Sequence, residues 1–319
     1  MSLAARDRPI YVCGVARSGT SLMRAILGMN SAVAMPPEEL HWWTRLLPRY
    51  RQATGGRDWQ LFLDRFADWP QTRLLGLDRD ELRARLESLQ PGDHGQVFGT
   101  TMRAFAERLG KPRWGDKAPQ LELFVSQIGE AFPGAAFVYM VRDPRDVAIS
   151  MYHYRPRFPR RRIARDVTWV TLNWRESVRV ARGVAARDPG RFFLVRYETL
   201  VDRPRETIAE LCGQLGLEFE LPMLEPHRFA GFGARGNSSF GEHDGIDRAG
   251  LARHLGRLPA RQVRLCEWLL GDELAAMGYA PERPPLGARE AALLPLEVAG
   301  AAADASVRAL DRLVRGVPR

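Results

Sequence analysis

A loop near the start of the chain has the residue types that bind a phosphate group. It runs from Gly14 to Ser21, reads GVARSGTS, and lies between a short apolar run and a segment with helical spacing. Backbone N–H groups at a helix N-terminus bind anions, and glycine lets the backbone approach a phosphate closely. In the nucleotide-hydrolysing loop GxxxxGK[ST] a lysine follows the second glycine, but here Thr20 takes that position and Arg17 supplies the cation. The loop therefore predicts phosphate binding of another kind; the alternative is a turn of small residues without a ligand.

A second candidate phosphate site follows a later apolar run. It reads RDPRDVAIS, from Arg142 to Ser150, and Arg142 comes directly after the predicted strand 135–141. Open α/β sheets bind ligands at the carboxyl ends of their strands. Ser150 lies six residues beyond Pro144, roughly 9 Å along a helix. A guanidinium and a hydroxyl suit a second, separate phosphate; the alternative is a helix cap with a surface ion pair.

Three strand–helix units must position these residues. Apolar runs predict strands at 9–15, 135–141 and 191–197. Helices are expected over 22–27, from Pro144 with Asp143 as N-cap to about Tyr154, and over 203–215. Repeated strand–helix units predict an α/β fold of three layers, similar to P-loop proteins, with a central parallel sheet flanked by helices.

The remaining segments complete one expected domain, residues 1–281. A helical insertion at about 40–111, rich in Trp and Arg, is expected to cover the active site at the carboxyl edge of the sheet. Within it, Trp42 and Trp43 form either an acceptor wall or part of the core. A glycine-rich loop is expected at 231–245. The Pro- and Ala-rich tail 282–319 is a linker, a packing arm or a partly disordered segment, and 307–314 is compatible with a short amphipathic helix.

Composition limits the classes of function. The chain has 319 residues, a net charge of +9 and three scattered cysteines. These features predict a cytoplasmic protein without a disulfide framework, a metal site or a membrane span. Lys111 and Lys117 are the only lysines among 47 basic residues, which suggests that each needs a compact point charge. The basic surface suits an anionic partner; a nucleic-acid-binding protein is one alternative, although no recognition motif supports it.

Taken together, the motifs resemble the sulfotransferases that use 3′-phosphoadenosine-5′-phosphosulfate (PAPS). In that family the [RK]SGT[TS] loop binds the 5′-phosphosulfate, and a strand-end arginine with a serine eight residues later binds the 3′-phosphate. The resemblance assigns the first role to Arg17, Ser18, Gly19, Thr20 and Ser21, and the second to Arg142 and Ser150. The segment RYETL resembles the family's RYExL, whose tyrosine approaches the nucleotide, and this implies a role for Tyr197. The resemblance covers about residues 8–281.

The bacterial and tyrosylprotein sulfotransferases are the most similar branch. There an acid follows a short hydrophobic stretch, and the resemblance aligns Glu38 with it, with the adjacent Glu39 as the alternative. A DKxP-like lysine aligns with Lys117. The chain departs from the family where Val15 and Ala16 replace the usual xP, and where alanine follows Lys117. The histidine base of the cytosolic small-molecule branch has no obvious counterpart.

The resemblance implies a sulfotransferase without a metal, with PAPS as co-substrate and 3′,5′-adenosine diphosphate (PAP) as product. Glu38 is the expected general base, and Lys117 and Arg17 are expected to stabilise the leaving phosphate. An ATP-dependent small-molecule or nucleotide kinase is the alternative activity. The acceptor stays open among small-molecule, sugar and peptide hydroxyls and amines, and the sequence is compatible with a homo-oligomer. The arginine-rich segment 155–165 is either a solvated face or a docking site for an acidic acceptor.

Overall fold

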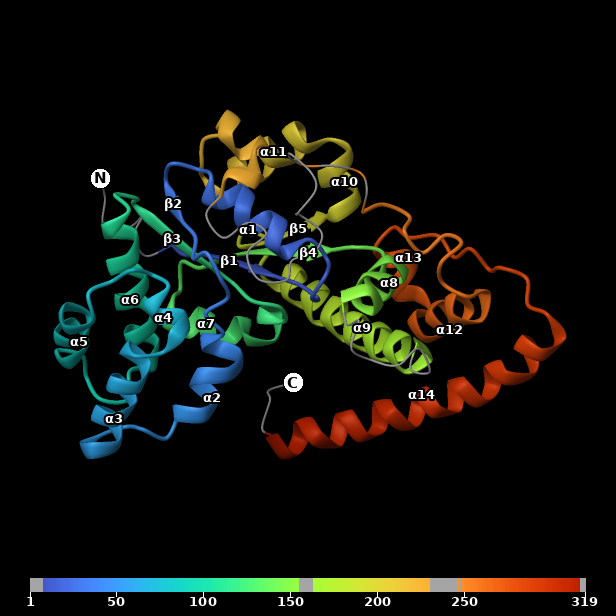
Figure 1. The fold of residues 1–319 in the computed structure, drawn as a ribbon, viewed down its shortest axis with the longest axis horizontal. Coiled ribbons are helices and arrows are strands. Elements are labelled where there is room, and N and C mark those ends of the chain that lie inside the picture. The colour runs from blue at the N-terminus through green and yellow to red at the C-terminus, as the bar shows by residue number, and fades with distance from the viewer. Residues whose placement is uncertain (1–7, 155–162, 230–245, 247, 249, 316–319) are drawn as a thin grey trace.

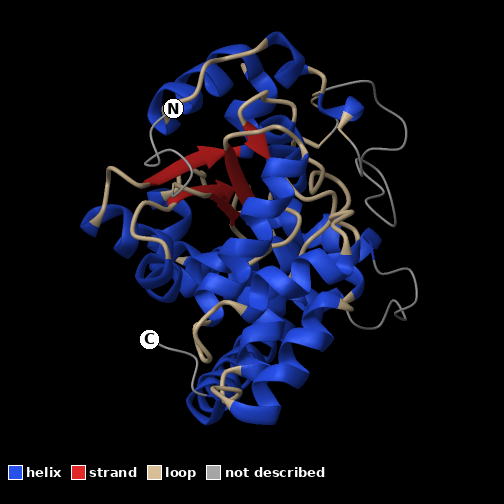
Figure 2. Ribbon diagram, turned by 90° about the vertical axis from the view of Figure 1, so that its left-hand side faces the viewer, coloured by secondary structure: helices blue, strands red, loops and turns tan. Residues whose placement is uncertain are grey.

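A five-stranded parallel sheet forms the centre of the computed structural model, which describes residues 8–154, 163–229, 246, 248 and 250–315. The strand order is β2-β3-β1-β4-β5, and every neighbouring pair is parallel. Figure 2 shows the strands in red, surrounded by helices. The strands are β1 (Ile10–Cys13), β2 (Val33–Ala34), β3 (Arg113–Lys117), β4 (Ala136–Val141) and β5 (Phe192–Arg196). The three strands predicted from apolar runs are confirmed as β1, β4 and β5.

Strand β3 was not predicted, because its sequence has no apolar pattern. It reads Arg-Trp-Gly-Asp-Lys, yet all five of its residues are buried. The strand lies between β2 and β1, in the interior of the sheet. Lys117 is therefore the last residue of a central strand rather than a residue of a solvated loop.

Side chains of β1 alternate between the two faces of the sheet, and each face packs against a layer of helices. Ile10 and Val12 pack against helix α1 (Thr20–Gly28) and helix α11 (Pro204–Leu215). Tyr11 and Cys13 face the opposite layer, which includes helix α9 (Ile163–Arg187). Figure 1 shows α1 and α11 on one side of the strands and α9 on the other. This three-layer arrangement confirms the predicted fold class.

The tryptophan-rich segment between β2 and β3 forms helices. Their buried side chains belong to the same hydrophobic core as Tyr11. The indole rings of Trp42 and Trp43 are fully buried, and Trp42 stacks on Phe98 with ring centroids 5.2 Å apart. Both tryptophans are therefore core residues rather than an exposed acceptor wall. The helices are α2 (Leu47–Tyr50), α3 (Gly56–Ala67), α4 (Pro70–Arg73), α5 (Arg79–Glu87) and α6 (His94–Arg108), preceded by the π-helix η2 (Trp42–Leu46).

The C-terminal tail contains a longer helix than predicted. Helix α14 (Ala288–Arg315) has 28 residues, whereas only 307–314 were expected to be helical. Its alanine-rich sequence favours a continuous helix, despite Pro295 in its interior. Leu294 and Val298 pack against Leu265 of helix α12 (Ala260–Leu270). Figure 1 shows α14 running past α12 and α9 on the side that faces away from the strands. The domain boundary at residue 281 stays a prediction.

The remaining elements are short or lie around the site. They are the 3-10 helices η3 (Leu121–Phe124), η5 (Leu221–Leu224) and η6 (Pro226–Arg228), and the helices α7 (Val125–Ala131), α8 (Pro144–Tyr154), α10 (Tyr197–Asp202) and α13 (Asp272–Ala276). Within the described ranges, no helix has both the length and the apolar character needed to cross a membrane. The same part of the chain contains no group of three or more side chains able to hold a metal ion.

Candidate active site

The predicted site residues meet at the carboxyl edge of the sheet. The glycine-rich loop follows β1, Lys117 ends β3, Arg142 follows β4, and Tyr197 follows β5. In a parallel sheet these strand ends lie along one edge, which is where open α/β folds bind their ligands. The order of the strands thus brings together residues up to about 180 positions apart in sequence.

The loop between β1 and α1 has a conformation that requires glycine. Gly14 and Gly19 have positive φ angles of 123° and 91°, and Gly19 is the N-cap of α1. A β-carbon at Gly19 would lie 2.6 Å from the ring of Tyr197. Arg17 also has a positive φ, 75°, which is uncommon for a residue with a side chain. The loop therefore places the N-terminus of α1 directly beside Tyr197.

A buried carboxyl stabilises this loop from the core side. The backbone N–H of Gly14 donates to Glu122 Oε2 at 2.9 Å, and the Ser177 hydroxyl donates to Glu122 Oε1 at 2.5 Å. Burial raises the pKa of Glu122. Sequence reasoning missed this residue, although one signal was present: Glu122 is an acid inside the apolar run from Leu121 to Val125.

The two predicted phosphate motifs contact each other. The Nε–H of Arg17 donates to Ser150 Oγ at 3.1 Å, and an Nη1–H of Arg142 donates to the Arg17 carbonyl at 3.1 Å. The guanidinium of Arg142 lies 4.5 Å from the centre of the Tyr197 ring. Asp143 behaves as the predicted N-cap of α8, because its carboxylate accepts the backbone N–H of Arg145 at 2.9 Å. The structure thus brings Arg17, Arg142, Ser150 and Tyr197 together.

Two polar atoms of this cluster fit an anionic ligand. Ser18 Oγ and Arg142 Nε are buried and have no hydrogen-bond partner among the described residues. A buried donor without a partner costs free energy, so native proteins rarely leave one unsatisfied. Both atoms belong to residues that the sequence assigns to phosphate binding. A hydroxyl and a guanidinium are suitable donors to phosphate oxygens.

Lys117 is the cation at the other end of the site. Its ammonium donates to Ser21 Oγ at 3.1 Å and forms an ion pair with Glu39 Oε1. The other carboxylate oxygen of Glu39 lies 3.2 Å from His41 Nε2. Burial opposes ionisation of Glu39, but Lys117 and His41 hold the pKa of this carboxyl below its usual range. Burial lowers the pKa of Lys117, an effect that the negative charge of Glu39 opposes.

The two adjacent acids of the candidate base differ in their contacts. Glu38 was aligned with the family's acid, but Glu39 is the residue that contacts Lys117. Among the described contacts, Glu38 has no hydrogen bond or ion pair with Lys117. The roles of both residues stay predictions. The predicted loop 231–245 and residues 155–162 of the arginine-rich segment 155–165 lie outside the described residues.

Comparison with known proteins identifies the family. Residues 9–221 match the sulfotransferase family, which is about two thirds of the chain. The chain belongs to the sulfotransferase family. It is therefore a transferase, and sulfuryl transfer is its class of reaction. The family match does not favour the kinase alternative.

Two related sequences support this assignment. A Caenorhabditis briggsae protein named "Putative protein-tyrosine sulfotransferase" is 28% identical over 231 residues, which cover 70% of this chain and 71% of that protein. The Drosophila melanogaster "Protein-tyrosine sulfotransferase" is 27% identical over 243 residues, which cover 70% of this chain and 41% of the relative. This sulfotransferase thus spans less than half of the Drosophila protein.

A solved structure has the same fold. The sulfotransferase domain of the Synechococcus PCC 7002 olefin synthase superposes with a TM-score of 0.62 and 20% sequence identity. The superposition covers 86% of this sulfotransferase and 96% of that domain. At this identity the likeness shows the α/β fold alone.

Proposed function

We propose that this sulfotransferase moves the sulfuryl group of PAPS to a hydroxyl or amine acceptor. The observation that carries the proposal is the meeting of the loop 14–21 with Arg142, Ser150 and Lys117 at one edge of the sheet. PAPS carries a phosphosulfate on the 5′ position and a phosphate on the 3′ position of its ribose, and the site has two cationic regions. No metal takes part in the proposal, because the leaving group is a phosphate that arginine and lysine can stabilise.

Each end of the donor has its own set of residues. The loop amides, the loop hydroxyls and Arg17 would bind the 5′-phosphosulfate at the N-terminus of α1. Arg142 and Ser150 would bind the 3′-phosphate, and Tyr197 would contact the nucleotide. The 5′ set comprises Arg17, Ser18, Gly19, Thr20 and Ser21. The unpartnered Ser18 Oγ and Arg142 Nε support these assignments.

The transfer itself needs a base for the acceptor and a cation for the leaving group. The acceptor oxygen loses its proton to a carboxylate, forms a bond to sulfur, and displaces the phosphate oxygen from the opposite side. Lys117 and Arg17 stabilise the charge that develops on the phosphate oxygen. Much of the rate comes from holding donor and acceptor in line.

The base belongs to the Glu38–Glu39 pair, and the geometry favours Glu39. The carboxylate of Glu39 contacts Lys117, the same cation that would contact the leaving phosphate. When the ammonium of Lys117 turns toward the leaving oxygen, Glu39 loses its ion-pair partner and its affinity for a proton rises. Proton uptake by the base and charge stabilisation at the leaving group would then occur together.

Matched amide substitutions distinguish the two carboxylates. Glu39→Gln should lower kcat by about 10²–10⁴-fold, as expected for a lost general base, whereas Glu38→Gln should stay within roughly threefold of wild type. The measurement is transfer of a radiolabelled sulfuryl group from PAPS to a panel of acceptors. The opposite ranking would assign the base to Glu38. Equal, small losses would show that neither carboxylate removes the proton.

The acceptor panel begins with tyrosine-containing peptides. Relatives at 27–28% identity carry the name protein-tyrosine sulfotransferase, and this supports tyrosine as the first acceptor to test. Phenols, sugars, aliphatic alcohols and amines complete the panel. The proposed donor would be contradicted if no acceptor gained label and if the control reactions also showed no hydrolysis of PAPS.

A further inference from the structure

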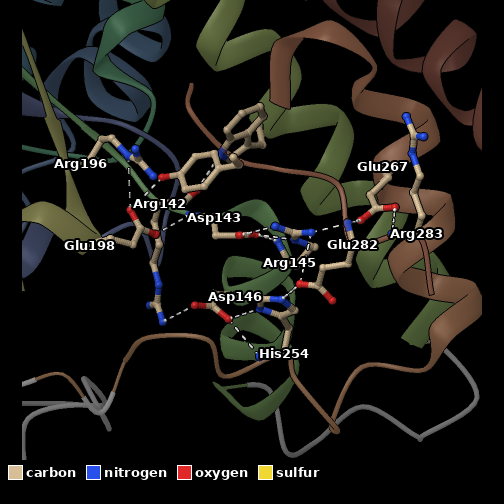
Figure 3. Close-up of polar contacts among 12 residues, drawn as sticks. Arg142, Asp143, Arg145, Asp146, Arg196, Glu198, His254, Glu267, Glu282 and Arg283 are labelled. Carbon is tan, nitrogen blue, oxygen red and sulfur yellow. Dashed lines mark hydrogen bonds and ion pairs between the residues drawn. The ribbon is translucent and has the colours of Figure 1, made fainter. Parts of the chain in front are cut away.

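A buried network of charged side chains connects helix α8 to the C-terminal part of the chain. Figure 3 shows Asp146 between Arg142 and His254, with Glu282 on the far side of the imidazole. Nδ1 of His254 lies 2.5 Å from Asp146 Oδ1, and Nε2 contacts Glu282 Oε1. His254 and Asp146 are buried, whereas Glu282 is partly exposed. One histidine thus joins two carboxylates from separate segments.

The same segment reaches Arg142 by two routes. The carbonyl of Gly250 accepts a hydrogen bond directly from an Nη2–H of Arg142. Asp146 Oδ1 accepts the backbone N–H of His254 at 2.9 Å, and Asp146 Oδ2 lies 3.9 Å from Arg142 Nη2. Asp146 is therefore shared between the histidine and the arginine assigned to the 3′-phosphate.

The charges around His254 favour a positive imidazole. Arg145 pairs with Asp143 at 2.7 Å, with Glu267 at 3.1 Å and with Glu282 at 3.3 Å. Among the described residues, the charged groups of this network around the imidazole are four carboxylates and two guanidiniums: Asp143, Asp146, Glu267, Glu282, Arg142 and Arg145. Four carboxylates and two guanidiniums leave a net negative charge, which a proton on His254 reduces. Burial alone would lower the pKa of His254, but the hydrogen bonds to Asp146 and Glu282 raise it above its usual range.

We propose that His254 is a positioning residue which, in its protonated form, holds Asp146 and so leaves Arg142 available for the 3′-phosphate of the nucleotide. The inference rests on the proposed function, because it needs Arg142 to bind that phosphate. When His254 is neutral, Asp146 loses a cationic partner and pairs more strongly with Arg142. The carboxylate then competes with the phosphate for the same guanidinium.

The proposal predicts an effect confined to one end of the ligand. His254→Gln removes the charge while keeping a polar side chain of similar length. PAP should bind roughly tenfold more weakly to this variant at about pH 6.5, a size typical of coupled neighbours. Adenosine 5′-monophosphate lacks the 3′-phosphate, so its affinity should change by less than about twofold. Calorimetry measures both dissociation constants.

The dependence on pH gives a second readout. A histidine whose pKa is raised on folding contributes while it is protonated, and the contribution disappears as pH rises through that raised pKa. The ratio of PAP dissociation constants, variant over wild type, should therefore fall toward one from about pH 6 to about pH 9. Ionisation of the nucleotide itself cancels in this ratio. His227→Gln, in η6 and outside the network, is the matched histidine control and should give a ratio near one throughout.

The possible failures are distinguishable. If wild-type protein does not bind PAP, the proposed function fails. If PAP binds, but His254→Gln weakens PAP and adenosine 5′-monophosphate equally, His254 is merely structural and the inference fails alone. A pH-independent ratio would also overturn it. If His254→Gln does not fold, Glu282→Gln is the second variant, because it removes the partly exposed carboxylate that contacts His254. Glu282→Gln should weaken the binding of PAP, but not of adenosine 5′-monophosphate, by a smaller factor.

Discussion

At the scale of single residues, Asp116 shows how unusual the environment beside Lys117 is. Asp116 is fully buried in β3, and neither carboxyl oxygen has a hydrogen-bond partner among the described residues. Burial raises the pKa of Asp116 to about 7. Because an unpaired buried carboxylate is costly, Asp116 keeps its proton in the folded protein at pH values where an exposed aspartate is ionised. Lys117, the next residue, therefore has Glu39 rather than Asp116 as its main counter-ion.

Asp116 makes the stability of the protein depend on pH. Because its pKa is higher in the folded state than in the unfolded chain, stability falls as pH rises from about 4 to about 7. Asp116→Asn cannot ionise. It should therefore be more stable than wild type by about 2–4 kcal/mol at pH 8, with little difference near pH 4. Urea unfolding at the two pH values checks this; an equal difference at both would contradict it.

At the scale of elements, Lys111 fixes the end of α1 to β2. Its ammonium donates to the carbonyls of Gly28, Asn30 and Val33 at 2.9, 2.7 and 2.8 Å. An ammonium has three N–H donors, so all of them are used. A planar guanidinium does not match three carbonyls converging on one point. This geometry explains one of the two lysines in a chain that otherwise uses arginine.

Loss of Lys111 should destabilise this junction. Lys111→Met keeps the aliphatic stem and leaves three carbonyls without their donor, so the free energy of unfolding should fall by about 2–4 kcal/mol. Lys111→Arg should show an intermediate loss. Denaturant titration followed by circular dichroism measures both variants. Unchanged stability in Lys111→Met would show that water replaces the ammonium at no cost.

The sequence predicted the elements whose pattern follows from burial alone. β1, β4 and β5 are nearly continuous apolar runs, as buried parallel strands require. β3 does not follow this rule, because its charged residues are buried through contacts with distant segments. Arg113, for example, donates to the carbonyl of Leu215 at 2.7 Å. Such contacts depend on the complete fold, and no local periodicity reveals them.

The sequence predicted those residues of the candidate site that belong to recognisable motifs. The two motifs predicted Arg17, Arg142 and Ser150 as neighbours in one site, and these residues contact one another in the structure. The choice between Glu38 and Glu39 depends on the path of the backbone, which turns at His41 with a positive φ of 55°. Two adjacent acids point in different directions, and sequence alone cannot tell which one meets Lys117. His254 was missed because its two carboxylate partners lie 108 and 28 residues away.

At the scale of the whole molecule, the site is assembled from segments that span most of the chain. The loop after β1, the end of β3, the start of α8, the start of α10 and the segment at Gly250 all meet at one edge of the sheet. Arg142 connects three of them, since it contacts Arg17, Tyr197 and Gly250. The central claim is that this convergence is a binding site for a nucleotide with a 3′-phosphate. Arg142 is the residue on which that claim most depends.

The most direct test is calorimetric binding of PAP, without added metal, to wild type and to Arg142→Ala. Loss of a buried arginine–phosphate contact should weaken binding by about 2–4 kcal/mol. Thermal unfolding of the variant serves as the control for folding. Metal-free binding that collapses in Arg142→Ala is the predicted result. Absence of PAP binding, equal affinity in the variant, or tighter binding of ATP with Mg²⁺ would contradict the account.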